Sequence, residues 1–317
     1  MIKLRGIHHI TAIASDPQRN LDFYTQVLGL RLVKRTVNFD DPGSYHFYFG
    51  DGVGSPGTII TFFPWPGARR GTRGTGQVVA ASYAVAPEAM DYWKTRLRAE
   101  HVLAEEIAPR FGERVLRFPD PDGLMLELVS ADQLKAVEFH EQGGVPAEFA
   151  LRGFHAPTLE VQASALTEQL LTEAFGFELI RDEHGRRRFS LSPGSPDAQI
   201  DLIERRDAGF GNIAAGTVHH IAFRAASDDE QRHWHDAVEK LGLRVTPVID
   251  RQYFHSIYFR EPGGILFEIA TDHPGFAIDE PVEHLGETLR LPPQFEEHRS
   301  SIEQTLPPIS LAHSSSS

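Results

Sequence analysis

The chain has 317 residues and a mass of 35.4 kDa, a length that suggests about two compact units. Its 41% hydrophobic and 24% charged residues are ordinary for a globular protein. A net charge of −13 argues against a partner whose phosphates must be neutralised, so nucleic acid is not expected. No apolar run approaches the roughly 20 residues of a membrane helix, and the N-terminus lacks the pattern of a signal peptide. We therefore expect a cytoplasmic protein with no membrane partner.

The sequence contains no cysteine. Disulfides, thiolate zinc sites, iron–sulfur clusters and cysteine nucleophiles are thereby excluded. A metal site would have to use His, Asp or Glu, and 16 histidines supply candidates.

The first predicted elements form a β-α-β-β-β unit. An extended run over 6–14 is followed by Ser15, Asp16 and Pro17, which suit the cap and the first turn of a helix. Apolar residues then recur at helical spacing up to Leu28, and Gly29 is placed to end the helix. Strand-like runs follow at 31–37, 45–50 and 58–63.

The same order returns three times. The later copies begin at 78–85, 153–161 and 217–223, and their last strands lie at 124–128, 199–203 and 265–269. Their starts are further apart than the roughly 20 to 50 residues of stacked repeats. We predict an α+β fold in which four βαβββ modules form two domains of paired half-barrels.

Glycine and proline at 142–146 interrupt both helix and strand patterns and mark a boundary. The sequence then divides into an N-terminal domain at 1–140, a C-terminal domain at 147–275 and a tail at 276–317, with two modules in each domain. A second glycine-rich segment, 67–76, reads as a flexible connector.

Superposing the four copies singles out positions with chemistry. One position in the first strand of each copy is, in order from the first copy to the fourth, His9, Ala81, Ala156 and His220. One position in the last strand of each copy is, in the same order, Thr61, Glu127, Asp201 and Glu268. The first and fourth copies together therefore hold two histidines and one carboxylate.

Strand alternation places the two histidines of a doublet on opposite faces, so only one can face the concave side. Glu268 lies in an otherwise apolar strand, where an unpaired buried charge would cost several kcal/mol. A divalent cation would offset that cost. Two imidazoles and one carboxylate form the facial triad of non-heme Fe(II) oxygenases, and Thr61 would leave the fourth side open. The alternative is that each doublet is a pair of hydrogen-bonded strand histidines.

The chain also resembles a known family. The matching stretches are 6–11, 56–58, 61–65, 218–223, 250–264, 271–276 and 291–293. They resemble the vicinal-oxygen-chelate (glyoxalase/bleomycin resistance/dioxygenase) superfamily, and nearly the whole chain is similar to its ring-cleaving, hydroquinone dioxygenase-like branch. The resemblance implies Fe(II), or Mn(II), bound by His9, His220 and Glu268.

The resemblance further implies that five side chains surround the substrate: His8, Thr11, His219, Arg251 and Tyr258. Tyr258 or a nearby histidine could move a proton from a bound diol, and Arg251 could stabilise negative charge. The alternatives are a salt bridge for Arg251, a core aromatic for Tyr258, packing or ligand support for His8 and His219, and strand filler for Thr11.

The expected activity is Fe(II)-dependent, extradiol-type cleavage of a hydroquinone or catechol by dioxygen. One rival is a glyoxalase-like isomerase or lyase using a non-redox metal on the same fold; Thr61 in place of a second carboxylate favours the dioxygenase. The other rival is a noncatalytic ligand-binding module. A homo-oligomer is the default assembly.

Overall fold

A computed structural model describes residues 3–191 and 198–311. All four modules are present. The first comprises β1 (Ile7–Ala14), α1 (Pro17–Asp22), η1 (Phe23–Val27), β2 (Arg31–Asn38), β3 (Asp41–Gly50) and β4 (Ile59–Pro64). The second comprises β5 (Gln77–Val85), α2 (Ala89–Ala99), β6 (Ala108–Arg110), β7 (Glu113–Pro119) and β8 (Met125–Ser130), followed by η2 (Ala147–Phe149).

The third module comprises β9 (Thr158–Val161), α3 (Ala165–Gln169), η3 (Leu170–Ala174), β10 (Glu178–Glu183), β11 (Arg186–Ser190) and β12 (Gln199–Glu204). The fourth comprises β13 (Val218–Ala225), α4 (Asp228–Lys240), β14 (Ile249–Asp250), β15 (Phe254–Arg260) and β16 (Leu266–Pro274). The tail contains η5 (Phe276–Ile278), η6 (Val282–His284), η7 (Pro293–His298) and α5 (Arg299–Thr305). Its last six residues, 312–317, lie outside the described ranges.

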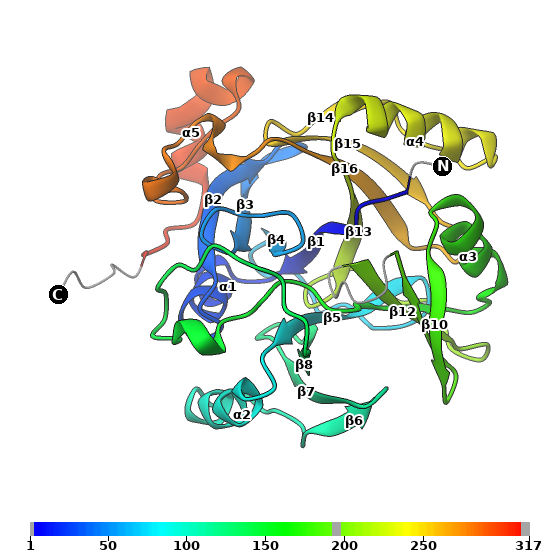
Figure 1. Cartoon of the computed structure of the whole chain (residues 1–317). Coiled ribbons are helices and arrows are strands. Elements are labelled where there is room, and N and C mark those ends of the chain that lie inside the picture. The colour runs from blue at the N-terminus through cyan, green and yellow to red at the C-terminus, as the bar shows by residue number, and fades with distance from the viewer. Residues whose placement is uncertain (1–2, 192–197, 312–317) are drawn as a thin grey trace.

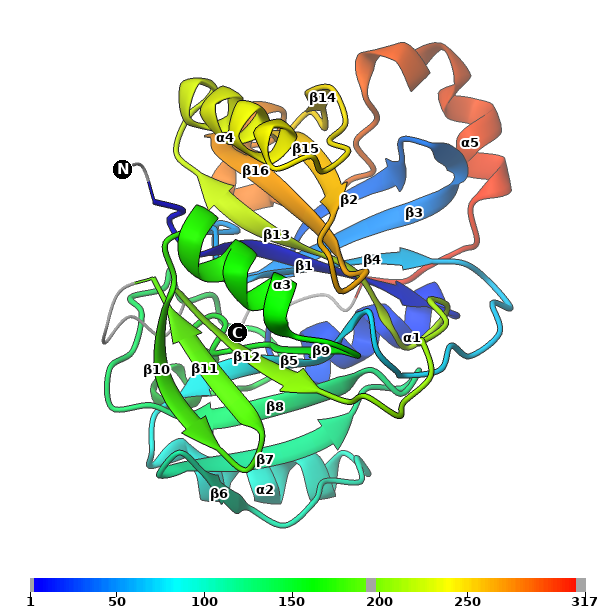
Figure 2. The ribbon, with the colours of Figure 1, turned by 90° about the vertical axis from the view of Figure 1, so that its right-hand side faces the viewer.

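The modules combine into two eight-stranded sheets. One has the order β14-β15-β16-β13-β1-β4-β3-β2, and the other β10-β11-β12-β9-β5-β8-β7-β6. Module one therefore pairs with module four and module two with module three, and the curved sheets form the upper and lower halves of Figure 2. The predicted paired half-barrels are confirmed. Each sheet takes one module from either side of residues 142–146, and the domain division there stays a prediction.

Helices cover the outer faces of the curved sheets (Figure 1). The first helix begins as expected, with the Asp16 side chain accepting the Arg19 N–H and Pro17 in the first turn. Trp93 of α2 and Trp234 of α4 are buried beneath their sheets. Within the described ranges, no helix is both long and apolar enough to traverse a bilayer.

The first strand of the third module is shorter than predicted. It starts at Thr158 rather than at 153, because Ala156 adopts a left-handed φ of 45° and Pro157 has no N–H to donate to a ladder. Only four residues of the expected run remain extended.

Strand register corrects one of the aligned positions. In the parallel pairs, Thr11 lies beside Thr61 and Ala222 beside Glu268. His9 is thus two residues before the strand partner of Thr61, and His220 is two residues before the strand partner of Glu268. The partner of Glu127 is Ser82, so the residue matching His9 is Ala80 and not Ala81. Both strands have a bulge at this place, at His8 and at Val79, so the predicted match was displaced by one residue.

Candidate metal centre

Each His-His doublet sits on a β-bulge. In the antiparallel pair of β1 and β13, His8 is an extra residue on β1, and His219 is an extra residue on β13. A bulge locally breaks alternation and redirects a side chain. The expected opposite orientation of the two rings is therefore wrong. The Nδ1 atoms of His8 and His9 lie 2.9 Å apart, and those of His219 and His220 lie 2.7 Å apart.

Three potential ligand atoms converge between β1, β13 and β16. Glu268 Oε2 lies 3.2 Å from His9 Nε2 and 2.9 Å from His220 Nε2, and the two Nε2 atoms are 3.4 Å apart. The three residues are 0%, 2% and 5% exposed for Glu268, His9 and His220. Among the described residues, this trio forms a cluster that could hold a metal ion.

The geometry fits an octahedral divalent ion. Donors about 2.1 Å from a metal at right angles stand about 3 Å from one another, close to the three distances observed. Glu268 Oε2 is buried and has no hydrogen-bond partner among the described residues, whereas Oε1 accepts a 2.5 Å hydrogen bond from Ser256. One carboxylate oxygen is thus oriented by the protein, and the other is left for a ligand.

Protonation states also suit metal binding. Burial lowers the pKa of His220, so its imidazole is neutral near pH 7. Burial opposes ionisation of Glu268, but His9 and His220 hold its pKa well below the usual range. Neutral imidazole and ionised carboxylate are the forms that metals bind.

The adjacent histidines orient the ligands. If Nε2 of His9 and His220 bind a metal, their protons reside on Nδ1 and are donated to Nδ1 of His8 and His219. His8 lies behind His9, packs against Phe254 and bonds the Thr271 backbone. It lies outside the cavity lining, whereas His219 forms part of the wall.

A cavity of about 550 Å³ opens over the two histidines. Of the five residues expected around the substrate, four line this cavity: Thr11, His219, Arg251 and Tyr258. His8 does not. Apolar rings and an aliphatic chain cover much of the remaining wall: Phe39, Phe63, Trp65, Phe254 and Leu266. The cavity therefore fits an aromatic ring with one polar edge.

Arg251 and Tyr258 form a coupled pair at the wall. Arg251 Nε donates to Tyr258 Oη over 3.2 Å, and Nη1 bonds Asp40 over 3.1 Å. Burial, together with the Glu268 charge, raises the pKa of Tyr258, so its phenol stays protonated and donates. Arg251 thus makes a salt bridge, which was the alternative to a role beside the substrate, and it also faces the cavity.

His46 and Ser256 are among the polar residues of the site that sequence reasoning missed. His46 on β3 lines the cavity, and Ser256 on β15 holds Glu268. Each stands two residues before a tyrosine that also faces inward, Tyr48 and Tyr258 respectively. Strand alternation starting from Tyr258 would have found Ser256.

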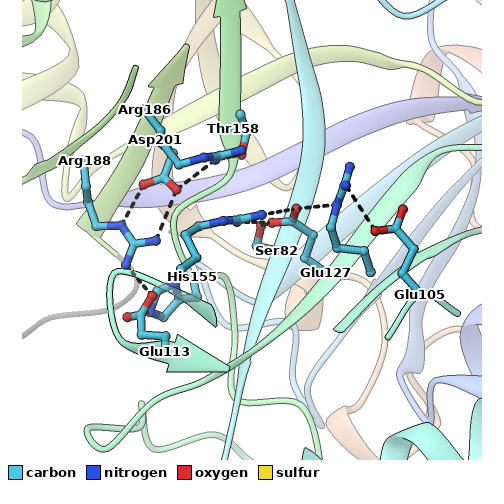
Figure 3. A network of polar contacts seen from close by, with 11 residues as sticks. Ser82, Glu105, Glu113, Glu127, His155, Thr158, Arg186, Arg188 and Asp201 are labelled. Carbon is cyan, nitrogen blue, oxygen red and sulfur yellow. Dashed lines mark hydrogen bonds and ion pairs between the residues drawn. The ribbon is translucent and has the colours of Figure 1, made fainter. Parts of the chain in front are cut away.

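The second half-barrel fills the corresponding place with arginines (Figure 3). Its carboxylates, Glu127 and Asp201, stand at the positions of Glu268 and Thr61 in the repeat. Arg110 contacts both oxygens of Glu127 at 2.7 and 2.8 Å, and Arg188 contacts both of Asp201 at 2.7 and 3.1 Å. Although burial opposes it, Arg110 holds the pKa of Glu127 at about 2. Fixed guanidinium groups compensate these buried carboxylates.

The paired βαβββ sheets and the two-histidine, one-carboxylate centre define the class of this protein. A family model, "Glyoxalase/Bleomycin resistance protein/Dioxygenase superfamily", matches residues 6–128 and 165–269, and the chain belongs to this superfamily. Maize glyoxalase I shares the fold, with a TM-score of 0.63 and 16% identity over 84% of this chain and 92% of that one.

Particular relatives are more similar. "Putative ring-cleaving dioxygenase MhqO" of Bacillus subtilis (strain 168) is 51% identical over 97% of both chains. "Chlorohydroquinone/hydroquinone 1,2-dioxygenase" of Sphingobium indicum is 34% identical over 96% of both. The crystal structure of a "putative dioxygenase from Bacillus subtilis subsp. subtilis str. 168" superposes with a TM-score of 0.94 and 50% identity, covering 99% of this chain and 100% of that chain.

Proposed function

We propose that the chain is an Fe(II)-dependent ring-cleaving dioxygenase of a hydroquinone or catechol, with His9, His220 and Glu268 as the metal ligands. The carrying observation is the convergence of two Nε2 atoms and the unpartnered Glu268 Oε2 within 3.4 Å, beside the aromatic cavity. Relatives described as ring-cleaving dioxygenases, one of them a hydroquinone dioxygenase, support the reaction type. Mn(II) is the second candidate metal.

Three protein ligands leave sites on the ion for a diol and dioxygen. A bound metal would lower the pKa of a diol hydroxyl and bring the two reactants together. The apolar wall formed by Phe63, Trp65 and Leu266 stacks against the ring and excludes water. Thr61, a hydroxyl where a fourth ligand would stand, distinguishes this centre from one with two carboxylates and favours the dioxygenase over an isomerase.

Arg251 and Tyr258 supply positive charge and a hydrogen-bond donor at the polar edge. The neutral Tyr258 phenol can donate to a deprotonated diol oxygen, and Arg251 holds that phenol in place while stabilising negative charge. His219 carries its proton on Nε2 when Nδ1 accepts from His220, so it too is a donor.

The test loads the protein with Fe(II) under anaerobic conditions and measures oxygen uptake with a panel of hydroquinones and catechols. We expect uptake with a ring-opened product containing both oxygen atoms. Glu268→Gln should lose bound metal and at least about 10²-fold in activity, because a neutral amide is a poor ligand for a hard cation. No uptake by protein shown to contain Fe(II) would reject the assignment. A cytoplasmic location and a homo-oligomer stay predictions.

A further inference from the structure

We propose that Thr11, Thr61 and His46 form a proton relay that takes the proton from a diol hydroxyl bound at the metal centre. This inference rests on the proposed function and names the proton acceptor that it requires. The diol must lose a proton to bind as an anion, and the residues suggested by the family resemblance are poorly suited to accept it.

The imidazoles beside the ligands have no lone pair to offer. His8 and His219 each use Nδ1 to accept the proton of a ligand histidine, which places their own proton on Nε2. Tyr258 is a protonated phenol, and Arg251 is a permanent cation. All four groups therefore act as donors toward the cavity.

His46 is connected to the cavity differently. Its Nε2 lies 2.9 Å from Thr61 Oγ1, which lies 2.9 Å from Thr11 Oγ1. Thr11 is two residues from His9 on β1 and lines the cavity. At the other end, His46 Nδ1 lies 3.0 Å from the Tyr48 hydroxyl. The hydrogen bonds form an unbroken chain from Thr11 at the cavity to the half-buried imidazole of His46, which stands further along the same wall.

Comparison of modules one and four shows that His46 stands where Ser256 stands in module four, the residue that orients Glu268. Tyr48 pairs with Thr61 across β3 and β4 as Tyr258 pairs with Glu268 across β15 and β16. His46 therefore occupies the place of Ser256. In module four the serine orients a carboxylate, and in module one an imidazole bonds a hydroxyl instead. The side of the centre without a fourth ligand thus contains a basic group.

The surroundings of His46 bear on its proton affinity. Burial lowers its pKa well below the usual range, and His9, His220 and Arg251 lower it further, whereas Glu268 raises it. Phe63 packs on the ring at 4.3 Å and Tyr48 at 4.1 Å. The other titratable groups that line the same cavity are the following: Asp40, Asp41, His219 and Tyr258. His46 is therefore neutral before substrate binds, and the negative charge of a bound diolate would favour its imidazolium form.

The transfer balances without another reactant. The diol O–H proton passes to Thr11 Oγ1 as the Thr11 proton passes to Thr61 Oγ1 and the Thr61 proton to His46 Nε2. The diol becomes a monoanion, His46 becomes an imidazolium, and both threonines remain neutral. The imidazolium donates through Nε2 to Thr61 and through Nδ1 to Tyr48 Oη. The same path returns the proton.

The experiment measures deprotonation apart from oxygen chemistry. Nitrohydroquinone, whose visible absorption shifts when a hydroxyl ionises, is mixed rapidly with protein loaded with redox-inert Zn(II), and the rate of the absorption change is recorded; 4-nitrocatechol serves as a second probe. Thr61→Val breaks the relay but keeps the side-chain shape. We expect it to slow ionisation of the bound probe by about 10²-fold and to lower oxygen uptake of the Fe(II) form by a similar factor.

Three further variants identify the cause. Thr61→Ser, which restores a hydroxyl, should restore the rate of ionisation, and His46→Gln, which can bond Thr61 but not gain a proton, should be as slow as Thr61→Val. Thr25→Val is the matched control, because its buried hydroxyl bonds Leu21 O in the helical segment before β2. An unchanged rate in Thr61→Val, or a slow rate that serine does not restore, overturns the relay alone. Failure of the wild-type Zn(II) protein to bind either diol, together with no oxygen uptake by the Fe(II) protein, rejects the proposed function and the relay with it.

Discussion

Ser256 shows how one hydroxyl can prepare a metal ligand. Its Oγ donates to Glu268 Oε1 over 2.5 Å, which leaves Oε2 directed at the two imidazoles. Ser256→Ala should weaken metal binding by about 10- to 100-fold, the usual effect of losing a group that orients a ligand. Competition titrations with a metal indicator would measure this change.

The second half-barrel provides the control for that measurement. Ser82 Oγ donates to Glu127 Oε2 over 2.7 Å at the corresponding carboxylate. Ser82→Ala removes the same atom from a carboxylate that already contacts Arg110, so metal affinity should be unchanged. Equal metal affinities for Ser256→Ala and wild type would show that Glu268 is held by its other contacts.

Asp120 is a buried acid whose titration should affect stability. Burial raises its pKa to about 7, although the N–H groups of Asp122 and Leu124 and the Tyr24 hydroxyl favour the charged form. A folded-state pKa above the unfolded value of about 4 means that its stabilising effect is complete below pH 4 and is lost as pH rises through 7.

Asp120→Asn removes this titration and keeps an oxygen for the two backbone donors. Relative to the variant, the wild type should lose about 2 kcal/mol or more of unfolding free energy between pH 5 and pH 8.5. Urea denaturation of both proteins at the two pH values measures the difference. A difference that does not change with pH would mean that Asp120 is ionised in the folded protein throughout this range.

At the scale of elements, a buried lysine links the tail to the sheet that carries His9, His220 and Glu268. Lys34 of β2 is 0% exposed and lies 2.6 Å from Asp279 and 2.5 Å from Glu280, over the ring of Tyr253. Lys34→Met would leave the buried Glu280 with Arg290 alone, 3.3 Å away, and should destabilise the protein by about 3 kcal/mol. Hydrogen exchange should rise first in residues 276–291.

Lys94→Met is the matched substitution for this test. Lys94 and Glu106 form an exposed ion pair, 45% and 86% accessible, for which a loss of at most about 1 kcal/mol is expected. If both methionine variants lost similar stability, or if exchange in 276–291 did not change, the tail would be held by its apolar contacts, such as Phe276 against Tyr48.

The individual elements also show which features the sequence could predict. Periodicity and turn residues predicted the modules, and repeat comparison brought His9, His220 and Glu268 together, because each signal is local or repeats itself. Bulges at His8 and His219 depend on pairing between strands some 200 residues apart, which no local pattern encodes. The segment 67–76, expected as a connector, also makes contacts that its own sequence does not predict: Thr72 pairs with Asn212, and a Cβ on Gly74 would approach Gly209 O to 2.6 Å.

At the scale of the whole molecule, one repeat has produced two half-barrels with different solutions for buried carboxylates. Glu268 faces two imidazoles and contacts no Lys or Arg among the described residues, whereas Glu127 and Asp201 contact guanidinium groups (Figure 3). An ion and an arginine compensate the same charge, so a half-barrel with arginines in place has no need of a metal. We therefore expect one metal ion per chain.

Elemental analysis of the purified protein and metal-dependent thermal shifts test this expectation together. Metal should raise the melting temperature of the wild type, since a ligand that binds the folded state stabilises it. Glu268→Gln should lose both the metal and the shift. Glu127→Gln should melt earlier, because it leaves Arg110 poorly compensated, by about 3–5 kcal/mol of unfolding free energy, yet should retain one metal per chain and a full shift. Two ions per chain, or loss of metal in Glu127→Gln, would show that the second half-barrel also binds a metal.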